Sequence, residues 1–139
     1  MSPARKRNVT TEELQQWIAV ASRAADDKKA TDIVVLEVGA VLGICDWFVI
    51  ASGSNTRQVK SIVDGIEEWV DGIEGPKPLR VEGLDTLEWV LMDYGDFVIH
   101  VFKEETRHFY DLERLWADVP RLAWTEIESP TTGRGRIGS

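Results

Sequence analysis

Two short apolar runs separated by a turn signal, in the segment EWVLMDYGDFVIHVF at residues 88–102, constrain the fold more than any other feature of the chain. Each run is long enough to form one strand. The residues between them include Gly95, which adopts the positive φ of a tight turn without steric cost. The segment therefore predicts two consecutive antiparallel strands, and so a fold built around a sheet.

The side chains of the first of these two strands are expected to alternate between the two faces of the sheet. Side chains alternate along a strand, which places Trp89, Leu91 and Asp93 on one face and Val90 and Met92 on the other. If Val90 and Met92 line the core, the outward face presents an aromatic and aliphatic patch with an acidic rim, the composition of a protein-binding hot spot. The alternation alone leaves the reverse orientation open, in which the Trp89 face is buried.

Three further strands and a short helical turn are expected from local patterns. The β-branched runs DIVVLEV and WFVIAS, at residues 32–38 and 47–52, predict two internal strands. Residues 79–82 predict a short third strand, and the connection at residues 41–46 has room for one helical turn.

Helical periodicity predicts three longer helices. The first begins at a capping box formed by Thr10 and Glu13, and the second follows the cap residue Asn55. The third is expected to span Thr106 to Ala117 and to end before Pro120. Four of its residues are predicted to face inward: Phe109, Leu112, Leu115 and Trp116.

The order of these elements predicts an α/β fold in which helices pack on a mixed sheet of about five strands. A chain of 139 residues is long enough for one core, so we expect a single domain at residues 10–120. A basic tail at residues 1–9 and an extension at residues 121–139, disordered at its end, are expected to flank it.

The charge distribution bears on the choice of partner. All 24 acids lie between Glu12 and Glu128, whereas five of the 16 bases lie in the tails, so the body carries 24 acids against 11 bases. Nucleic-acid affinity comes mainly from Lys and Arg that neutralise phosphates, so we expect no direct nucleic-acid binding by this body. A basic protein partner suits this acidic body better, although the same acidity is also explained by solubility alone.

No stretch reaches the ~20 consecutive apolar residues of a membrane span, which favours a cytosolic protein.

Catalytic chemistry has little support in the sequence. The Ser52–Asn55 turn between a strand and a helix suits a phosphate cradle, but it lacks the lysine of a P-loop. A nucleotidyl transferase would add paired strand carboxylates that hold Mg²⁺, and here the next carboxylate is Asp64, on a predicted helix. A nucleotide-binding or nucleotidyl-transfer protein that uses this turn remains the alternative, and a generic acidic dimerisation module is a third reading.

The remaining reactive side chains favour structural roles. Cys45 is the only cysteine and is expected to be a small core residue. His100 shares a strand face with Val98 and Phe102, where a hydrogen-bonded structural histidine is expected. His108 is expected near a helix start and exposed. We therefore expect no catalytic residues, metal ligands or cofactor.

Several separated motifs agree in order and spacing with one known family. They are DIVVLEV, CDWFVIASGSNTRQVKSIVD, RVEG, WVLMDYGDFVIHVF and ETRHFYDLERLW. The most specific are W-x4-[YL]-G-D-x3-H-V and R-x2-Y-x-L-E-x-L-W. From about residue 32 to residue 116 the chain resembles the ribosomal silencing factor family, also called RsfS or Iojap.

The resemblance implies a function and a fold. Family members bind a large-subunit ribosomal protein, the fourteenth in the usual count, on the face of the large subunit that meets the small one. The implied protein is a translation repressor that sterically blocks subunit joining when nutrients run short. The implied fold is like that of nucleotidyltransferases without their catalytic carboxylates.

The resemblance also assigns a partner-binding site. Trp89, Asp93 and Tyr94 match positions on the ribosome-facing strand and turn of the family, and geometry adds Leu91 and Asp96. The position of Tyr94 varies between Tyr and Leu, so its hydroxyl is expected to be dispensable. The same patch, left uncovered, is expected to form a homodimer of the free protein.

Overall fold

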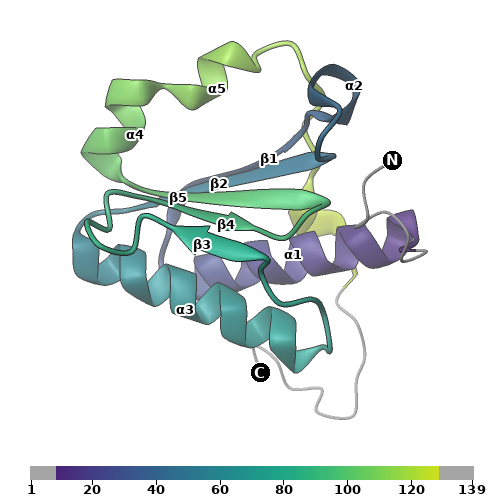
Figure 1. Ribbon diagram of the computed structural model, residues 1–139, viewed down its shortest axis with the longest axis horizontal. Coiled ribbons are helices and arrows are strands. Elements are labelled where there is room, and N and C mark those ends of the chain that lie inside the picture. Colours follow the sequence, from purple (N-terminus) through teal and green to yellow (C-terminus); the bar gives the residue numbers. More distant parts are fainter. Residues whose placement is uncertain (1–8, 129–139) are drawn as a thin grey trace.

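The computed structural model describes residues 9–128, which form one five-stranded mixed sheet with helices on both faces (Figure 1). The predicted α/β class with a sheet of five strands is confirmed. The elements in chain order are α1 (Thr11–Asp27), β1 (Thr31–Glu37), α2 (Gly39–Leu42), β2 (Trp47–Gly53), α3 (Thr56–Gly72), β3 (Arg80–Glu82), β4 (Trp89–Asp93), β5 (Phe97–Lys103), α4 (Glu104–Tyr110), α5 (Leu112–Leu115) and a 3₁₀ helix (Trp124–Glu126).

The strands lie in the order β1-β2-β5-β4-β3. Strands β2 and β5 run parallel, and the other neighbouring pairs run antiparallel. The predicted pair β4–β5 is antiparallel as expected, and it closes through a turn in which Gly95 has a φ of 90° and Tyr94 N–H donates to the Phe97 carbonyl at 2.9 Å. Residues 88–102, which most constrained the predicted fold, therefore form the neighbouring strands β4 and β5.

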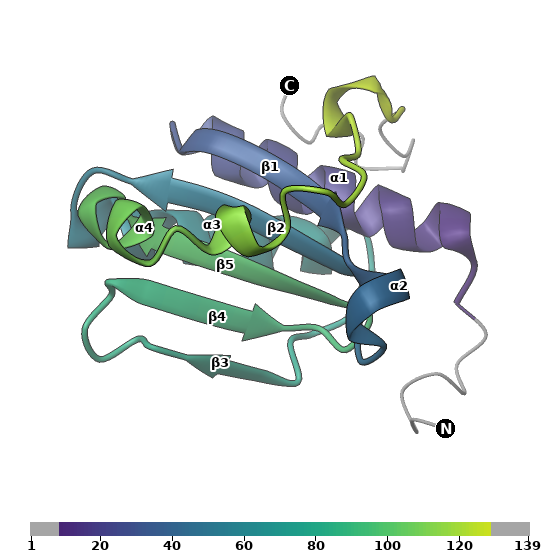
Figure 2. The same ribbon diagram turned by 90° about the horizontal axis from the view of Figure 1, so that it is seen from above.

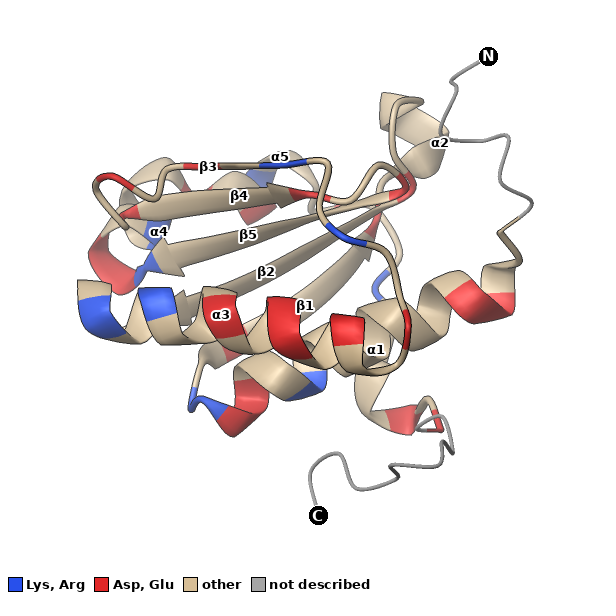
Figure 3. Ribbon diagram, turned by 60° about the horizontal axis from the view of Figure 1, so that its bottom comes forward, with Lys and Arg blue, Asp and Glu red and all other residues tan. Residues whose placement is uncertain are grey.

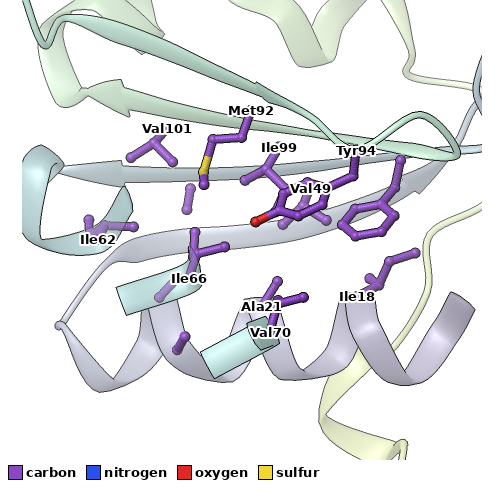
Figure 4. Packing of buried hydrophobic residues seen from close by; sticks show 14 of the residues in the cluster. Ile18, Ala21, Val49, Ile62, Ile66, Val70, Met92, Tyr94, Ile99 and Val101 are labelled. Carbon is purple, nitrogen blue, oxygen red and sulfur yellow. The ribbon is translucent and has the colours of Figure 1, made fainter. Parts of the chain in front are cut away.

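One face of the sheet is sealed by α1 and α3 (Figure 1). The predicted caps begin both helices: Thr10 and Glu13 form a reciprocal capping box, and the Asn55 side chain accepts from Gln58 N–H at 2.8 Å. Apolar stripes of the two helices pack on Val90, Met92 and the other strand residues that point to this side. Figure 4 shows this first core, which contains Ile18, Ala21, Val49, Ile62, Ile66, Val70, Met92, Tyr94, Ile99 and Val101.

The opposite face carries a smaller apolar cluster and shorter helices. Its buried members are Leu36, Val38, Cys45, Phe48, Ile50 and Phe102. The ribbons of α4 and α5 lie over β2 and β5, and those of β3 and β4 lie to one side of them (Figure 2). Cys45 is buried among these residues, as the sequence predicts for a core thiol.

The predicted single helix from Thr106 to Ala117 is wrong. The chain leaves helical geometry at Asp111, which has a φ of 49°, so α4 and α5 are separate short helices. Aspartate tolerates this left-handed conformation better than most residues. The break changes which side chains turn inward: Leu112 and Trp116 pack on the second cluster as predicted, but Phe109 and Leu115 are 79% and 76% exposed.

The segment that follows α5 covers one edge of the sheet. Glu37 N–H donates to the Pro120 carbonyl at 2.9 Å, and Leu122 N–H donates to the Val35 carbonyl at 3.0 Å. Leu122 and Trp124 then pack against the first core. The basic tail and the end of the chain, residues 1–8 and 129–139, lie outside the described residues, and with them the predicted disorder.

Candidate protein-binding face

The side chains of β4 have the orientation that a protein-binding hot spot on this strand would require. Val90 and Met92 are fully buried in the first core, and Trp89, Leu91 and Asp93 lie partly exposed on the other face. They pair across the sheet with Phe102, His100 and Val98 of β5. We call the partly exposed part of this surface, made by Trp89, Leu91, Asp93 and Val98, the open face.

Trp89 is more enclosed than an outward strand residue would be. Its ring lies 4.8 Å from that of Phe102 and 5.0 Å from that of Tyr110 in α4, centroid to centroid. The indole Nε1–H donates to Nδ1 of His100 at 3.1 Å. The indole therefore does not stand free in water, because α4 covers it on one side and its polar atom is already bonded within the chain.

His100 is the structural, hydrogen-bonded histidine that the sequence predicts. It is 4% exposed, lies 4.6 Å from the Phe48 ring, and accepts the Trp89 hydrogen bond at Nδ1. Burial lowers the pKa of His100 to about 4, so the ring is neutral near pH 7. Because Nδ1 is the acceptor, the proton of the neutral ring is on Nε2. No hydrogen-bond partner lies within reach of that Nε2 among the described residues.

Two of the predicted site residues do not lie on the open face. The Tyr94 side chain is 2% exposed and stacks on Phe97 at 4.7 Å in the first core, where burial raises its pKa (Figure 4). Asp96 is 5% exposed, and its carbonyl accepts from Asp46 N–H at 2.8 Å. Both residues, which were expected to contact the partner, are therefore buried in this structure. The alternation that orients Trp89 already pairs Tyr94 with Met92, and that signal was available in the sequence.

Asp93 lies at the edge of the open face with both oxygens engaged. Its Oδ1 accepts from Gly95 N–H at 2.9 Å, the aspartate turn-capping bond that the turn sequence favours. Its Oδ2 lies 3.5 Å from Arg80 Nε, and the same Arg80 nitrogen lies 3.5 Å from Glu82. Two carboxylates thus surround one guanidinium, which leaves this rim of the face net acidic.

A groove of about 390 Å³ continues the open face toward the loop before β2. Its lining residues are Leu42, Ile44, Cys45, Phe48, Leu79, Arg80, Leu91, Asp93, Gly95, Val98 and His100. Ile44 and Leu79, from two separate loops, are 78% and 65% exposed. The sequence pointed to neither as a site residue, because a single apolar residue in a loop has no periodic pattern around it.

Helices α4 and α5 are fixed to the sheet by a buried arginine. Arg107 Nε and Nη2 donate to the two carboxylate oxygens of Glu113 at 3.1 and 2.9 Å, and Nη1 donates to Ser52 Oγ at 2.9 Å. These charge-assisted bonds hold the pKa of the Glu113 carboxyl below its usual value. The clamp sets the position of α4, and thus of Tyr110 over Trp89.

The Ser52–Asn55 turn, which the alternative hypothesis assigns to nucleotide binding, is occupied by the side chain of Gln58 from α3. Gln58 Oε1 accepts from Ser54 N–H at 2.7 Å, and Ser52 Oγ is bonded to Arg107. Asp64 is exposed on α3 and paired with Lys60 at 2.8 Å. Within residues 9–128, no three His, Cys, Asp or Glu side chains are grouped to hold a metal ion.

Acidic residues occur at many positions in the helical layer on the other side of the sheet. Figure 3 shows Asp and Glu along the outer surface of α3, with Lys and Arg near its N-terminal end. None of the described helices is long and apolar enough to cross a bilayer. The fold and the partly covered sheet face define an α/β domain with a candidate surface for protein binding.

Comparison with known proteins shows which family this domain belongs to. A family model described as "Ribosomal silencing factor during starvation" matches residues 11–137, and the chain belongs to this family. The chain is 39% identical over 103 residues to the ribosomal silencing factor RsfS of Bacillus subtilis, a match that covers 74% of this chain and 86% of that one. The family suggested by the sequence motifs is therefore confirmed.

Other relatives extend the comparison to organelles and to solved structures. A mouse protein named "Mitochondrial assembly of ribosomal large subunit protein 1" is 34% identical over 91 residues, 64% of this chain and 40% of that protein. A crystal structure of a protein from Chromobacterium violaceum matches with a TM-score of 0.72 at 29% identity, over 91% of this chain and 99% of that one. A second, from Bacillus halodurans, matches with a TM-score of 0.67 at 35% identity, over 78% and 97%.

Proposed function

We propose that this protein represses translation by binding a large-subunit ribosomal protein through the open face, so that its bulk blocks joining of the ribosomal subunits. The observation that carries the proposal is the incomplete cover of the second sheet face, which leaves Trp89, Leu91 and Val98 partly exposed beside an acidic rim. Apolar centres with polar rims are the usual anatomy of a protein interface. No catalytic step is required, because inhibition needs only occupied space.

Family membership and charge both support a ribosomal partner. The family is described by ribosomal silencing, and the name of the mouse relative refers to assembly of the large subunit. The body of 24 acids against 11 bases would attract a basic ribosomal protein over a distance before the apolar contacts form. The resemblance stated above specifies the fourteenth protein of the large subunit, on the side that meets the small subunit. The proposed place of action is the cytoplasm.

The direct test is co-sedimentation with separated ribosomal subunits. Wild-type protein should travel with large subunits and not with small ones. Leu91→Asp should lose about 2 kcal/mol or more of binding free energy, because it places a carboxylate where apolar contact is proposed. Leu115→Asp, which changes an exposed leucine of α5 outside the open face, is the matched control. Equal binding by Leu91→Asp and the control would refute the proposed surface.

The open face also supports self-association of the free protein. An uncovered apolar surface is a candidate for pairing with a second copy, and the dimer would have to separate before ribosome binding. Light scattering at high concentration should then give twice the monomer mass for wild type and the monomer mass for Leu91→Asp. A monomeric wild type at millimolar concentration would contradict the dimer without affecting the ribosomal proposal.

A further inference from the structure

A second groove lies over β1, the edge strand at the opposite side of the sheet from β3. We call it the β1 groove; it measures about 800 Å³ and shares no lining residue with the open face. The first half of β1, α4 and the segment after α5 contribute to its walls. Its charged lining residues are Asp32, Glu104, Asp111, Glu113, Arg107 and Arg121.

The β1 groove has more negative charge than its own cations neutralise. Four carboxylates face two guanidinium groups, which leaves an excess of two negative charges while His108 is neutral. Arg107 is 7% exposed and already forms a bidentate pair with Glu113, so only one guanidinium remains for the other three carboxylates. Arg114, outside the groove, lies 3.9 Å from Asp111, but both side chains are exposed and such a pair contributes little. The groove therefore favours a cationic occupant.

The chain itself contains a segment with the matching charge. Residues 129–139, which follow the described part of the chain, include Arg134 and Arg136 and no Asp or Glu. Gly133 and Gly135 stand on either side of the first arginine, and glycine allows a backbone to approach a neighbouring surface closely. Both arginines can therefore face the carboxylates of one groove without hindrance from bulky neighbours.

The described chain also ends within reach of the β1 groove. Arg121 lines the groove, and Ile127 is six residues further on, so their Cα atoms are at most about 22 Å apart. The Ile127 carbonyl accepts from Arg23 of α1, which fixes the point from which the following residues start. Arg134 is seven residues beyond Ile127 and can span up to about 25 Å from it. The segment is thus long enough to return to the groove.

The other basic segment of the chain starts at the wrong end of the molecule. Its cations are at residues 5–7, and the described chain begins at Val9, beside the N-terminal end of α1. Figures 1 and 2 show this end of α1 and helix α4 at opposite ends of the molecule. From Val9 the chain reaches Arg5 within about 14 Å, whereas α1 alone is about 25 Å long. The N-terminal segment therefore serves as a control for the C-terminal one.

We propose that residues 129–139 dock in the β1 groove, where Arg134 and Arg136 pair with the carboxylates that line it. The docked segment covers the Arg107–Glu113 pair and so helps to hold α4 and α5 on the sheet. A short tether gives an effective concentration of about millimolar, so a contact of millimolar affinity is formed about half of the time. The docking does not depend on the proposed function.

The first experiment locates the segment by paramagnetic broadening of amide signals in the full chain. A nitroxide is attached at Gly135→Cys in a Cys45→Ala chain, because Cys45 is the only native cysteine. The same label at Ser2→Cys is the control. Signals of residues 31–34 and 104–113 should lose most of their intensity with the label at position 135 and keep it with the label at position 2. Intact signals at the groove, or equal broadening from both labels, would overturn the proposal.

The second experiment tests whether charge holds the segment in place. Arg134→Glu combined with Arg136→Glu should abolish the broadening from position 135. Raising the salt from 0.1 to 1 M should do the same, because the screening length falls from about 10 to about 3 Å. Broadening at the groove that survives both changes would contradict pairing between the arginines and the carboxylates.

The third experiment separates the groove from the general acidity of the domain. Glu104 lines the groove, whereas its neighbour Glu105 does not and is paired with Lys103 at 3.3 Å. Glu104→Gln removes one charge but keeps an oxygen that can accept from Thr31 Oγ1. This variant should lower the ratio of docked to free segment about threefold, as expected for one exposed ion pair, and Glu105→Gln should leave it unchanged. Equal effects of the two variants would mean that the segment is attracted by net charge and not by this groove.

Discussion

The two faces of the sheet differ in how completely they are covered. Helices α1 and α3, 17 residues each, seal the first face, and strand residues such as Val90 and Ile99 there have no exposed surface. The second face carries α4 and α5, of seven and four residues, and these leave β4 partly bare. We therefore expect the first face to supply most of the stability of the fold, whereas the second face leaves apolar surface of β4 partly exposed.

The faces also differ in the use of polar atoms. On the first face the Tyr94 hydroxyl is buried without a hydrogen-bond partner among the described residues. On the second face Trp89 donates to His100 and Arg107 donates to Glu113, although Nε2 of His100 and Nε1 of Trp116 have no partner among the described residues. The second face thus contains two hydrogen-bonded side-chain pairs that fix the positions of an indole ring and of α4 relative to the sheet.

The largest expected effect contrasts one truncation on each face. Ile66→Ala should lower the free energy of unfolding by about 4 kcal/mol, because Ile66 is fully buried between α3 and the sheet. Leu112→Ala, at a partly buried residue of α5, should cost about 1 kcal/mol. Urea unfolding of both variants measures the difference. Similar losses would mean that the second face contributes as much stability as the first.

Acid should weaken the second face through His100. The folded pKa is about 4 against an ordinary 6.5, so between these values the unfolded chain binds a proton that the folded chain does not. Stability is therefore complete above pH 6.5 and falls as the pH drops toward 4, by roughly 3 kcal/mol at most.

Other titratable groups lie near His100, so the pH series needs a variant that lacks the histidine as its control. Asp93, Arg80 and Cys45 line the same groove as the ring. The lowered pKa of Glu113 acts later, because its stabilisation is lost only as the pH falls below about 4.5. His100→Asn should flatten the slope of unfolding free energy between pH 6.5 and 5. An unchanged slope in this variant would assign the acid sensitivity to another group.

Removing the arginine clamp should loosen the second face alone. Arg107→Met deletes the donors to Glu113 and Ser52 and should cost about 2 kcal/mol of unfolding free energy. Arg107→Lys should recover only part of this, because an ammonium cannot form the bidentate pair. Amide exchange should accelerate at residues 104–115 and stay slow in α3. Uniform acceleration across both faces would argue against independent roles.

The smallest expected effect concerns Tyr94. Tyr94→Phe removes a hydroxyl that is buried without a partner and keeps the ring on Phe97, so stability should stay within about 1 kcal/mol of wild type or rise. Binding to large subunits should not change, because the side chain points into the first core. A loss of binding in a stable Tyr94→Phe variant would show that the turn rearranges to expose this residue.

The sequence predicted the sealed face better than the open one. Long periodic stripes define α1 and α3. Strand alternation correctly separates Val90 from Trp89, but it left open which of the two faces is buried, and the structure shows that Val90 points inward. Short elements have no such period: the αL conformation of Asp111 divides the last helix and exposes Phe109 and Leu115. The groove residues Ile44 and Leu79 come together only through tertiary contacts between two loops, which local patterns do not contain.

Hydroxyl-radical footprinting of the protein on purified large subunits tests the central claim most directly, because it reports which face is covered. Protection is predicted at Trp89, Leu91 and Leu79, with no change at Trp69, a partly exposed tryptophan of α3 on the other layer. Protection of Trp69 and the outer surface of α3, with Trp89 and Leu79 as reactive as in the free protein, would contradict the assignment of the open face.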